Sequence, residues 1–115
     1  MTDPSEATGR SEPAATSLDA TRDLRIVDNA SRRRYEAVLG DEVVGFSEYA
    51  RTGSRIVFLH TEVAPDHEGR GVGSRLAAGA LDDVRAQGLK VTARCPFIAA
   101  YLRRHPEYRD LLAQP

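Results

Sequence analysis

The stretch VAPDHEGRGVGSRL, residues 63–76, decides the fold of this chain. It follows a segment with the pattern of a β-strand and opens a segment with the periodicity of an amphipathic helix. A strand, a glycine-rich turn and a helix N-terminus together make an anion receptor. Glycines let backbone N–H groups approach a phosphate, and the first turn of a helix leaves its own N–H groups unpaired. The stretch therefore predicts that the chain binds a phosphorylated cofactor.

Four segments before this turn have the character of β-strands: residues 24–27, 34–39, 43–49 and 55–63. The last of them is apolar on both faces at its start, as expected of a central strand. Gly45 suggests a bulge in the third segment. Because the connections between the segments are short, we expect an antiparallel meander.

The pattern changes after the turn. Apolar residues recur there at helical spacing, and they are Val72, Leu76, Ala80, Leu81 and Val84. Gly88 predicts the end of this helix, and residues 89–95 alternate again as a fifth strand. Pro96 suits the first turn of a helix, which predicts a short helix over residues 97–104 with Cys95 at or near its N-cap. A strand, helix and strand in this order predict a right-handed parallel crossover and an α/β fold with a mixed sheet.

The bulk composition narrows the class of protein. The chain has 115 residues, a net charge of −1 and one cysteine, and its hydrophobic fraction of 41% suffices for a single core. So small a net charge does not attract nucleic acid or an anionic membrane, and neither is expected as a partner. A lone cysteine excludes an intrachain disulfide and a zinc site with several thiolates. We find no long apolar run and no signal-peptide pattern, which predicts a cytoplasmic location.

Two regions differ in composition. Residues 1–21 are rich in Ser, Thr, Ala, Pro and acidic residues and have almost no large apolar residues, which predicts a disordered N-terminal tail. Residues 22–115 are expected to form one folded domain.

The pattern Val63-x-Pro65-x-x-x-Gly69-Arg70-Gly71-Val72-Gly73-x-x-Leu76 resembles motif A of the Gcn5-related N-acetyltransferase (GNAT) superfamily. Further segments resemble a small, minimal branch of predicted acetyltransferases within it: residues 60–63, residues 68–71, Cys95-Pro96-Phe97 with Tyr101, and residues 105–108. This resemblance implies a GNAT-like acyl-CoA N-acyltransferase fold without the C-terminal strand pair of typical members. It also implies acetyl-CoA-dependent transfer of an acetyl group to an amine.

The resemblance also implies where acetyl-CoA would bind. In the superfamily, backbone amides of the turn hold the pyrophosphate, and the preceding strand bonds the pantetheine arm through main-chain groups. Carried over, the cofactor-binding residues are Val63, Glu68, Gly69, Arg70, Gly71, Val72, Gly73, Ser74 and Arg75. Glu68 stands where Gln or Arg is usual, and main-chain contacts allow its carboxylate to point outward.

Four residues are candidates for the chemistry, which needs a base and a polarised thioester carbonyl. His60 and Glu62 are two apart on one strand, face the same way, and fit a base or water-relay role. Cys95 lies at a helix N-terminus and fits a nucleophile that carries the acetyl group or a contact to the cofactor sulfur. The resemblance implies Tyr101 as the general acid for the leaving thiolate. Purely structural roles stay open for all four.

The expected ligands are acetyl-CoA as co-substrate and an amine acceptor, with the chain acting as a monomer or homodimer. No metal site is expected, because the three histidines lack ligand spacing. Two other functions are compatible with the sequence: a non-catalytic acyl-CoA-binding module, and an interaction protein on the same fold.

Overall fold

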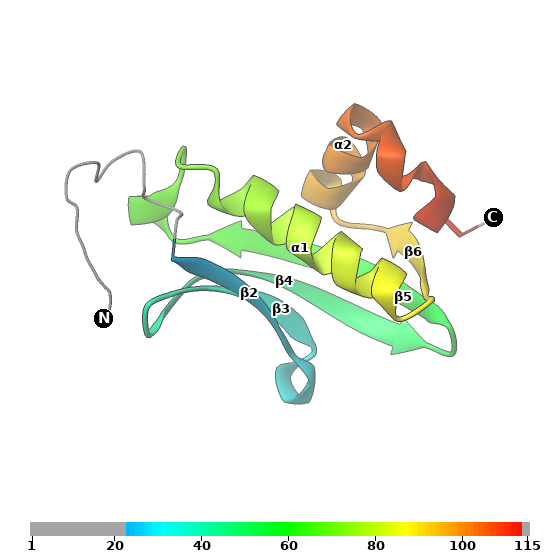
Figure 1. Ribbon diagram of the computed structural model, residues 1–115, viewed down its shortest axis with the longest axis horizontal. Coiled ribbons are helices and arrows are strands. Elements are labelled where there is room, and N and C mark those ends of the chain that lie inside the picture. Colours follow the sequence, from blue (N-terminus) through cyan, green and yellow to red (C-terminus); the bar gives the residue numbers. More distant parts are fainter. Residues whose placement is uncertain (1–22, 114–115) are drawn as a thin grey trace, which may run out of the picture.

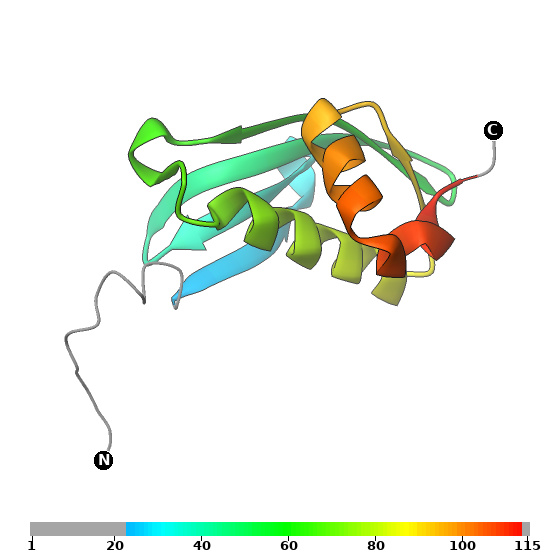
Figure 2. The same cartoon turned by 90° about the horizontal axis from the view of Figure 1, so that it is seen from above.

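The computed structural model describes residues 23–113, and the predicted tail of residues 1–21 lies outside the described residues. Five strands form one sheet in the described part, in the order β2-β3-β4-β5-β6. Helices α1 and α2 pack beside each other on the same face, with α1 crossing the sheet and α2 above β5 and β6 (Figures 1 and 2).

The strands are β2 (Leu24–Asn29), β3 (Arg34–Leu39), β4 (Glu42–Thr52), β5 (Arg55–Val63) and β6 (Lys90–Ala93). The helices are α1 (Val72–Ala86) and α2 (Pro96–Arg104), with the short 3-10 helices η2 (Ala30–Arg32), η3 (Pro65–His67) and η4 (Pro106–Leu111). Strands β2 to β5 pair antiparallel, and β6 pairs parallel with β5. The predicted antiparallel meander and the parallel pairing of the fifth strand are therefore confirmed.

Three strand ends differ from the sequence-based prediction. Strand β2 continues to Asn29 instead of ending at residue 27. Strand β4 continues to Thr52 instead of ending at residue 49. Strand β6 ends at Ala93, because the N–H groups of both Arg94 and Cys95 donate to the carbonyl oxygen of Phe58, at 2.9 and 3.0 Å. This shared acceptor turns the chain away from β5, and Pro96 then begins α2.

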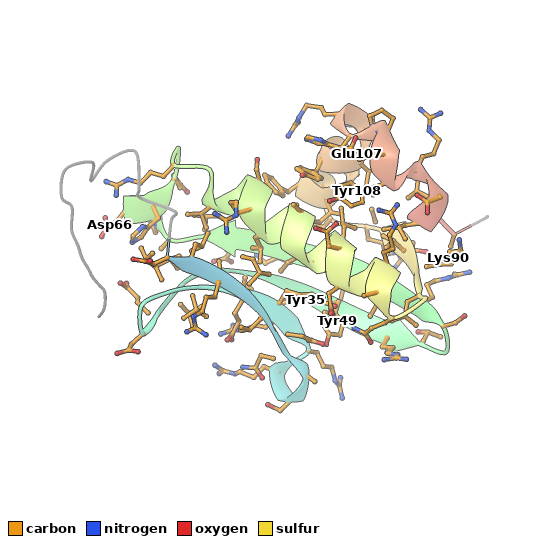
Figure 3. The ribbon with its side chains drawn as sticks, viewed as in Figure 1. Tyr35, Tyr49, Asp66, Lys90, Glu107 and Tyr108 are labelled. Atoms are coloured by element: carbon orange, nitrogen blue, oxygen red, sulfur yellow. The ribbon has the colours of Figure 1, made fainter. Side chains whose placement is uncertain are left out.

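The core lies between α1 and the sheet. The predicted apolar stripe of α1 is buried, and Ala77 joins it. On the sheet it meets the rings of Tyr35 and Phe58, and Tyr35 lies beside Tyr49 with ring centroids 5.4 Å apart (Figure 3). Gly79 permits this close packing, since a Cβ atom there would lie 2.8 Å from Ile26.

Two bulges interrupt the antiparallel register. Ala37 pairs with Gly45 but Val38 pairs with Val43, so Val44 is an extra residue, as the glycine next to it suggests. In the same way Glu48 pairs with His60 but Tyr49 pairs with Phe58, so Leu59 is an extra residue in β5. A bulge shifts the alternation of side chains by one residue. The bulge at Leu59 therefore decides which face each later residue of β5 presents.

The chain after α2 folds back along the sheet edge. The hydroxyl of Tyr108 in η4 donates to Asp82 of α1 at 2.8 Å, and the N–H of Ala113 donates to the carbonyl of Val91 at 2.8 Å. Within residues 23–113, a single bridge between Val91 and Leu112 is the only strand-like pairing after α2. The predicted mixed sheet with its helices is thus confirmed for the described residues. No helix in this range has the length and apolarity needed to cross a lipid bilayer.

Candidate functional site

A gap opens between β5 and the chain that follows β6. The parallel pairing ends at Phe58 and Ala93, whereas β5 continues to Val63 with only β4 as a strand partner in the described part of the chain. The main-chain groups of residues 59–63 on the β6 side therefore have no strand partner there. They can bond an extended ligand that lies in the gap.

The glycine-rich turn lies at the end of this gap. Gly69 and Gly71 have φ angles of +79° and +82°, a left-handed conformation that glycine adopts without strain. Gly71 is the N-cap of α1, no side chain caps the helix, and no acidic residue occupies its first turn. The first intrahelical bond runs from the N–H of Arg75 to the carbonyl of Gly71. The amides of residues 72–74 thus have no partner inside the helix, which leaves them available to an anion.

Side chains of the predicted cofactor residues differ in what they contact. Gly73 serves packing, because a Cβ atom there would lie 2.8 Å from the Phe97 ring. Val72 is buried. The guanidinium of Arg75 donates to the carbonyl of Leu24 at 3.2 Å. The remaining side chains, those of Glu68, Arg70 and Ser74, are exposed, and that of Val63 is half-buried. The amides, more than the side chains, therefore define this part of the site.

Cys95 anchors a chain of three polar side chains beside the gap. Its Sγ donates to the Oγ1 of Thr61 at 3.2 Å, and the hydroxyls of Thr61 and Ser47 are 2.9 Å apart. Cys95 is the N-cap of α2, as predicted, but its side chain makes no capping hydrogen bond. Cys95 and Ser47 are only 2% and 0% exposed, so these bonds satisfy groups that water cannot reach.

Sequence reasoning misses Thr61 and Ser47. What identifies the two residues is their pairing in the structure, where they face each other across β4 and β5. That pairing depends on the bulge at Leu59, and the bulge has no signature in the sequence.

His60 and Glu62 meet, as their spacing predicts. The Nε2 of His60 lies 2.7 Å from a carboxylate oxygen of Glu62, and both side chains are more than half exposed. The His60 ring centroid lies 6.3 Å from that of Phe46. This pair faces the side of β5 opposite to Thr61, because alternate residues of a strand point to opposite faces. The structure therefore does not bring the pair into contact with Cys95.

Tyr101 belongs to a cluster of rings near the C-terminal end of α2. It stacks on His105 with centroids 4.0 Å apart, and Tyr108 follows at 6.1 Å. Burial raises the pKa of Tyr101, and the charges of Glu107 and Asp82 raise it further. Six residues of helix separate it from the N-cap, a rise of about 9 Å. This surrounding favours a packing role, and its role as general acid stays a prediction.

We find no metal site in the part of the chain that the structure describes, where no three His, Cys, Asp or Glu side chains converge.

A mixed sheet in which a central strand runs past its parallel neighbour into a glycine-rich turn and a helix has the architecture of the GNAT fold. Residues 34–111 match a family described as GCN5-related N-acetyl-transferase. The chain belongs to this family.

The chain is also similar to proteins in other organisms and to a solved structure. Protein NATD1 of Homo sapiens is 37% identical over 87 residues, covering 72% of this chain and 75% of that protein. Protein NATD1 of Mus musculus is 35% identical over 95 residues, covering 79% of this chain and 84% of that protein. A solution NMR structure of a GCN5-like protein from Staphylococcus aureus superposes with a TM-score of 0.62 at 24% identity. It covers 81% of this chain and 91% of that chain, and it supports the fold.

Proposed function

We propose that this chain is an acetyl-CoA-dependent N-acetyltransferase that transfers an acetyl group to an amine. The observation that carries the proposal is the gap beside residues 59–63, which leads directly into the unpaired amides at the start of α1. An extended thioester with a pyrophosphate at one end matches this combination of free strand edge and anion receptor. The family of the chain supports the same class of reaction.

Acetyl-CoA would lie with its pyrophosphate on the amides of residues 72–74 and its pantetheine arm along β5. The exposed guanidinium of Arg70 adds positive charge at the turn. The thioester would then lie in the gap between the Cys95–Thr61 pair on one face of β5 and the His60–Glu62 pair on the other.

In the proposed reaction, the amine nitrogen attacks the carbonyl carbon of the thioester. The C–N bond forms, the C–S bond breaks, and coenzyme A leaves as a thiolate that takes up a proton. His60 accepts the proton of the substrate ammonium, and Glu62 orients its ring through the 2.7 Å contact. We favour direct transfer over a Cys95 intermediate, because Cys95 is buried and its thiol hydrogen is donated to Thr61.

The first test is calorimetric titration with acetyl-CoA. Ser74→Glu places a carboxylate in the exposed first turn of α1, which favours the helix but repels a pyrophosphate. Binding should weaken at least about tenfold, the loss expected for one charge-assisted contact. Thr52→Glu makes the same charge change at the other end of the sheet and is the matched control. No binding by the unaltered protein would contradict the proposal.

Assays of turnover and of the intact mass of the protein then distinguish the possible mechanisms. Release of free thiol on adding an amine, with no acetylated protein, would support direct transfer. An acetyl group that stays on the protein and is lost in Cys95→Ala would indicate the covalent route instead. Full activity of Tyr101→Phe would exclude Tyr101 as an essential proton donor. Binding without turnover on any amine would indicate an acyl-CoA-binding module.

A further inference from the structure

A pocket lies at the edge of the sheet, and none of its lining residues belongs to the glycine-rich turn. It has a volume of about 560 Å³, within the range of small-molecule sites. Its lining residues are Ala93, Ala99, Leu102, Arg103, Arg109 and Leu112. None of them belongs to the predicted cofactor or catalytic residues, although Ala93 stands where the gap between β5 and β6 opens.

Helical spacing explains which side of α2 lines the pocket. Phe97 and Tyr101 lie about one turn apart, on the side of α2 where the Phe97 ring meets Gly73 of α1. Ala99 and Arg103 lie about half a turn away and therefore face the opposite flank. Residues of the C-terminal segment form the facing wall, and edge strand β6 supplies Ala93.

The pocket has an apolar part that is open to solvent. Leu112 is 38% exposed, whereas its neighbour Leu111 is 3% exposed. Together with Leu102 and the two alanines, Leu112 gives a ligand an apolar surface to cover.

Two arginines of the pocket have no acidic partner among the described residues. Among residues 23–113, the guanidinium groups of Arg103 and Arg109 make no hydrogen bond and no ion pair. The nearby carboxylates are already engaged, since Asp110 pairs with Arg85 and Glu107 with His105. Guanidinium groups bind carboxylates with two parallel hydrogen bonds, which a lone surface lysine cannot do.

A neighbouring hollow adds to the positive charge. It has a volume of about 410 Å³ and shares Arg109 and Leu112 with the pocket. Its other charged lining residues are Arg55, Lys90 and Asp110, and the carboxylate of Asp110 pairs with Arg85. Lys90 lies beside the C-terminal segment (Figure 3), where it donates to the carbonyl of Asp110 at 2.8 Å. The field along this edge therefore attracts small anions.

We propose that this pocket binds a small organic carboxylate with an apolar body. The carboxylate pairs with Arg103 and Arg109, and the body covers Leu102 and Leu112. The proposal does not depend on acetyl transfer, because no group of the candidate active site takes part.

Hexanoate is a suitable probe, and its binding can be followed by the ¹⁵N chemical shifts of the full chain. We expect saturable shifts centred on Ala93, Ala99, Leu102 and Leu112. The double variant Arg103→Gln, Arg109→Gln should weaken binding at least about tenfold, as expected when a charge-assisted hydrogen bond is lost. Its melting temperature should stay unchanged, since neither side chain makes a bond that folding needs.

The controls distinguish specific binding in the pocket from non-specific attraction of anions to the surface. Arg104→Gln removes one positive charge from α2 outside the pocket lining, and this variant should bind hexanoate normally. Hexylammonium, which has the same apolar body and the opposite charge, should not bind. The proposal is overturned if shifts do not saturate, if they centre on residues 69–74, if inorganic phosphate binds equally well, or if Arg104→Gln weakens binding as much as the double variant.

Discussion

The thiol of Cys95 lies 3.2 Å from the hydroxyl of Thr61, although 34 positions separate the two residues in the sequence. Thr61 in turn contacts Ser47, so one chain of polar groups joins β4, β5 and the start of α2. These groups meet where β5 and β6 part. The contact thus links β5 to the start of α2 at the point where the candidate cofactor gap opens.

Removing the hydroxyl of Thr61 should destabilise the fold. Thr61→Val keeps the shape of the side chain but leaves Ser47, which is fully buried, without this partner. We expect a loss of about 1–3 kcal/mol in the free energy of unfolding, measured by guanidinium titration. Thr61→Ser restores the hydroxyl and should recover most of that loss. Equal stability of the two variants would contradict a structural role for this bond.

Removing the proposed base should abolish most acetyl transfer without harming the fold. General-base catalysis contributes about 10²–10⁴-fold, so His60→Gln should lower kcat by a factor in that range. Both side chains of the pair are exposed, so the melting temperature should change little. Glu48→Gln is the control, because Glu48 lies opposite His60 on β4 without contacting it through a hydrogen bond or ion pair. A kcat for His60→Gln equal to that of the control would exclude His60 as the base.

The close approach of α1 and α2 should depend on Gly73. A methyl group there would lie 2.8 Å from the Phe97 ring, so in Gly73→Ala either this ring or α2 must shift. We expect a loss of about 1–3 kcal/mol from overpacking, less the gain of about 1 kcal/mol in helix propensity. Adding Phe97→Leu should relieve the clash, and thermal unfolding of all four proteins completes a double-mutant cycle. Additive effects of the two changes would show that the contact does not matter.

Stability should fall steeply in alkaline solution. Burial raises the pKa of Tyr49 from 10.0 to about 12, and the hydrogen bond to Asp28 adds to the shift. A group whose pKa is raised in the folded state stabilises the protein fully below its unfolded pKa. That contribution is lost as the pH rises from 10 towards 12. Burial and hydrogen bonds to Asp83 and Asp82 raise the pKa values of Tyr35 and Tyr108 in the same direction.

Tyr49→Phe tests this pH dependence. The variant should be less stable than the unaltered protein at pH 8, because the hydroxyl that bonds Asp28 is missing. Its melting temperature should then decline less between pH 10 and 12. Melting curves followed by circular dichroism across that range measure both effects, and parallel declines would rule out a contribution from Tyr49.

Local sequence patterns were enough to predict most of the fold. The apolar stripe of α1 has a period that only a helix satisfies, and burial of that stripe follows from it. The glycine-rich turn was equally readable, since Gly69 and Gly71 both take the positive φ that glycine permits. Short connections between strands left the antiparallel meander as the simplest pairing. The contact of His60 with Glu62 followed from spacing alone.

The partners of Cys95 were decided by the tertiary structure. An unbulged β5 would present His60 and Glu62 on the same face as Phe58, towards the core. The extra residue Leu59 reverses this alternation, so Thr61 reaches Cys95 and the His60–Glu62 pair faces outward. The end of β6 was also decided at a distance, by the carbonyl of Phe58, which accepts two N–H groups.

The sequence by itself therefore determined the elements, their order and the glycine-rich turn, because periodicity and backbone preferences act between near neighbours. Only the tertiary structure decided which face each residue of β5 presents and where the gap opens. Strand register is a property of two chains of residues in contact, and one extra residue in either of them moves every side chain beyond it to the other face.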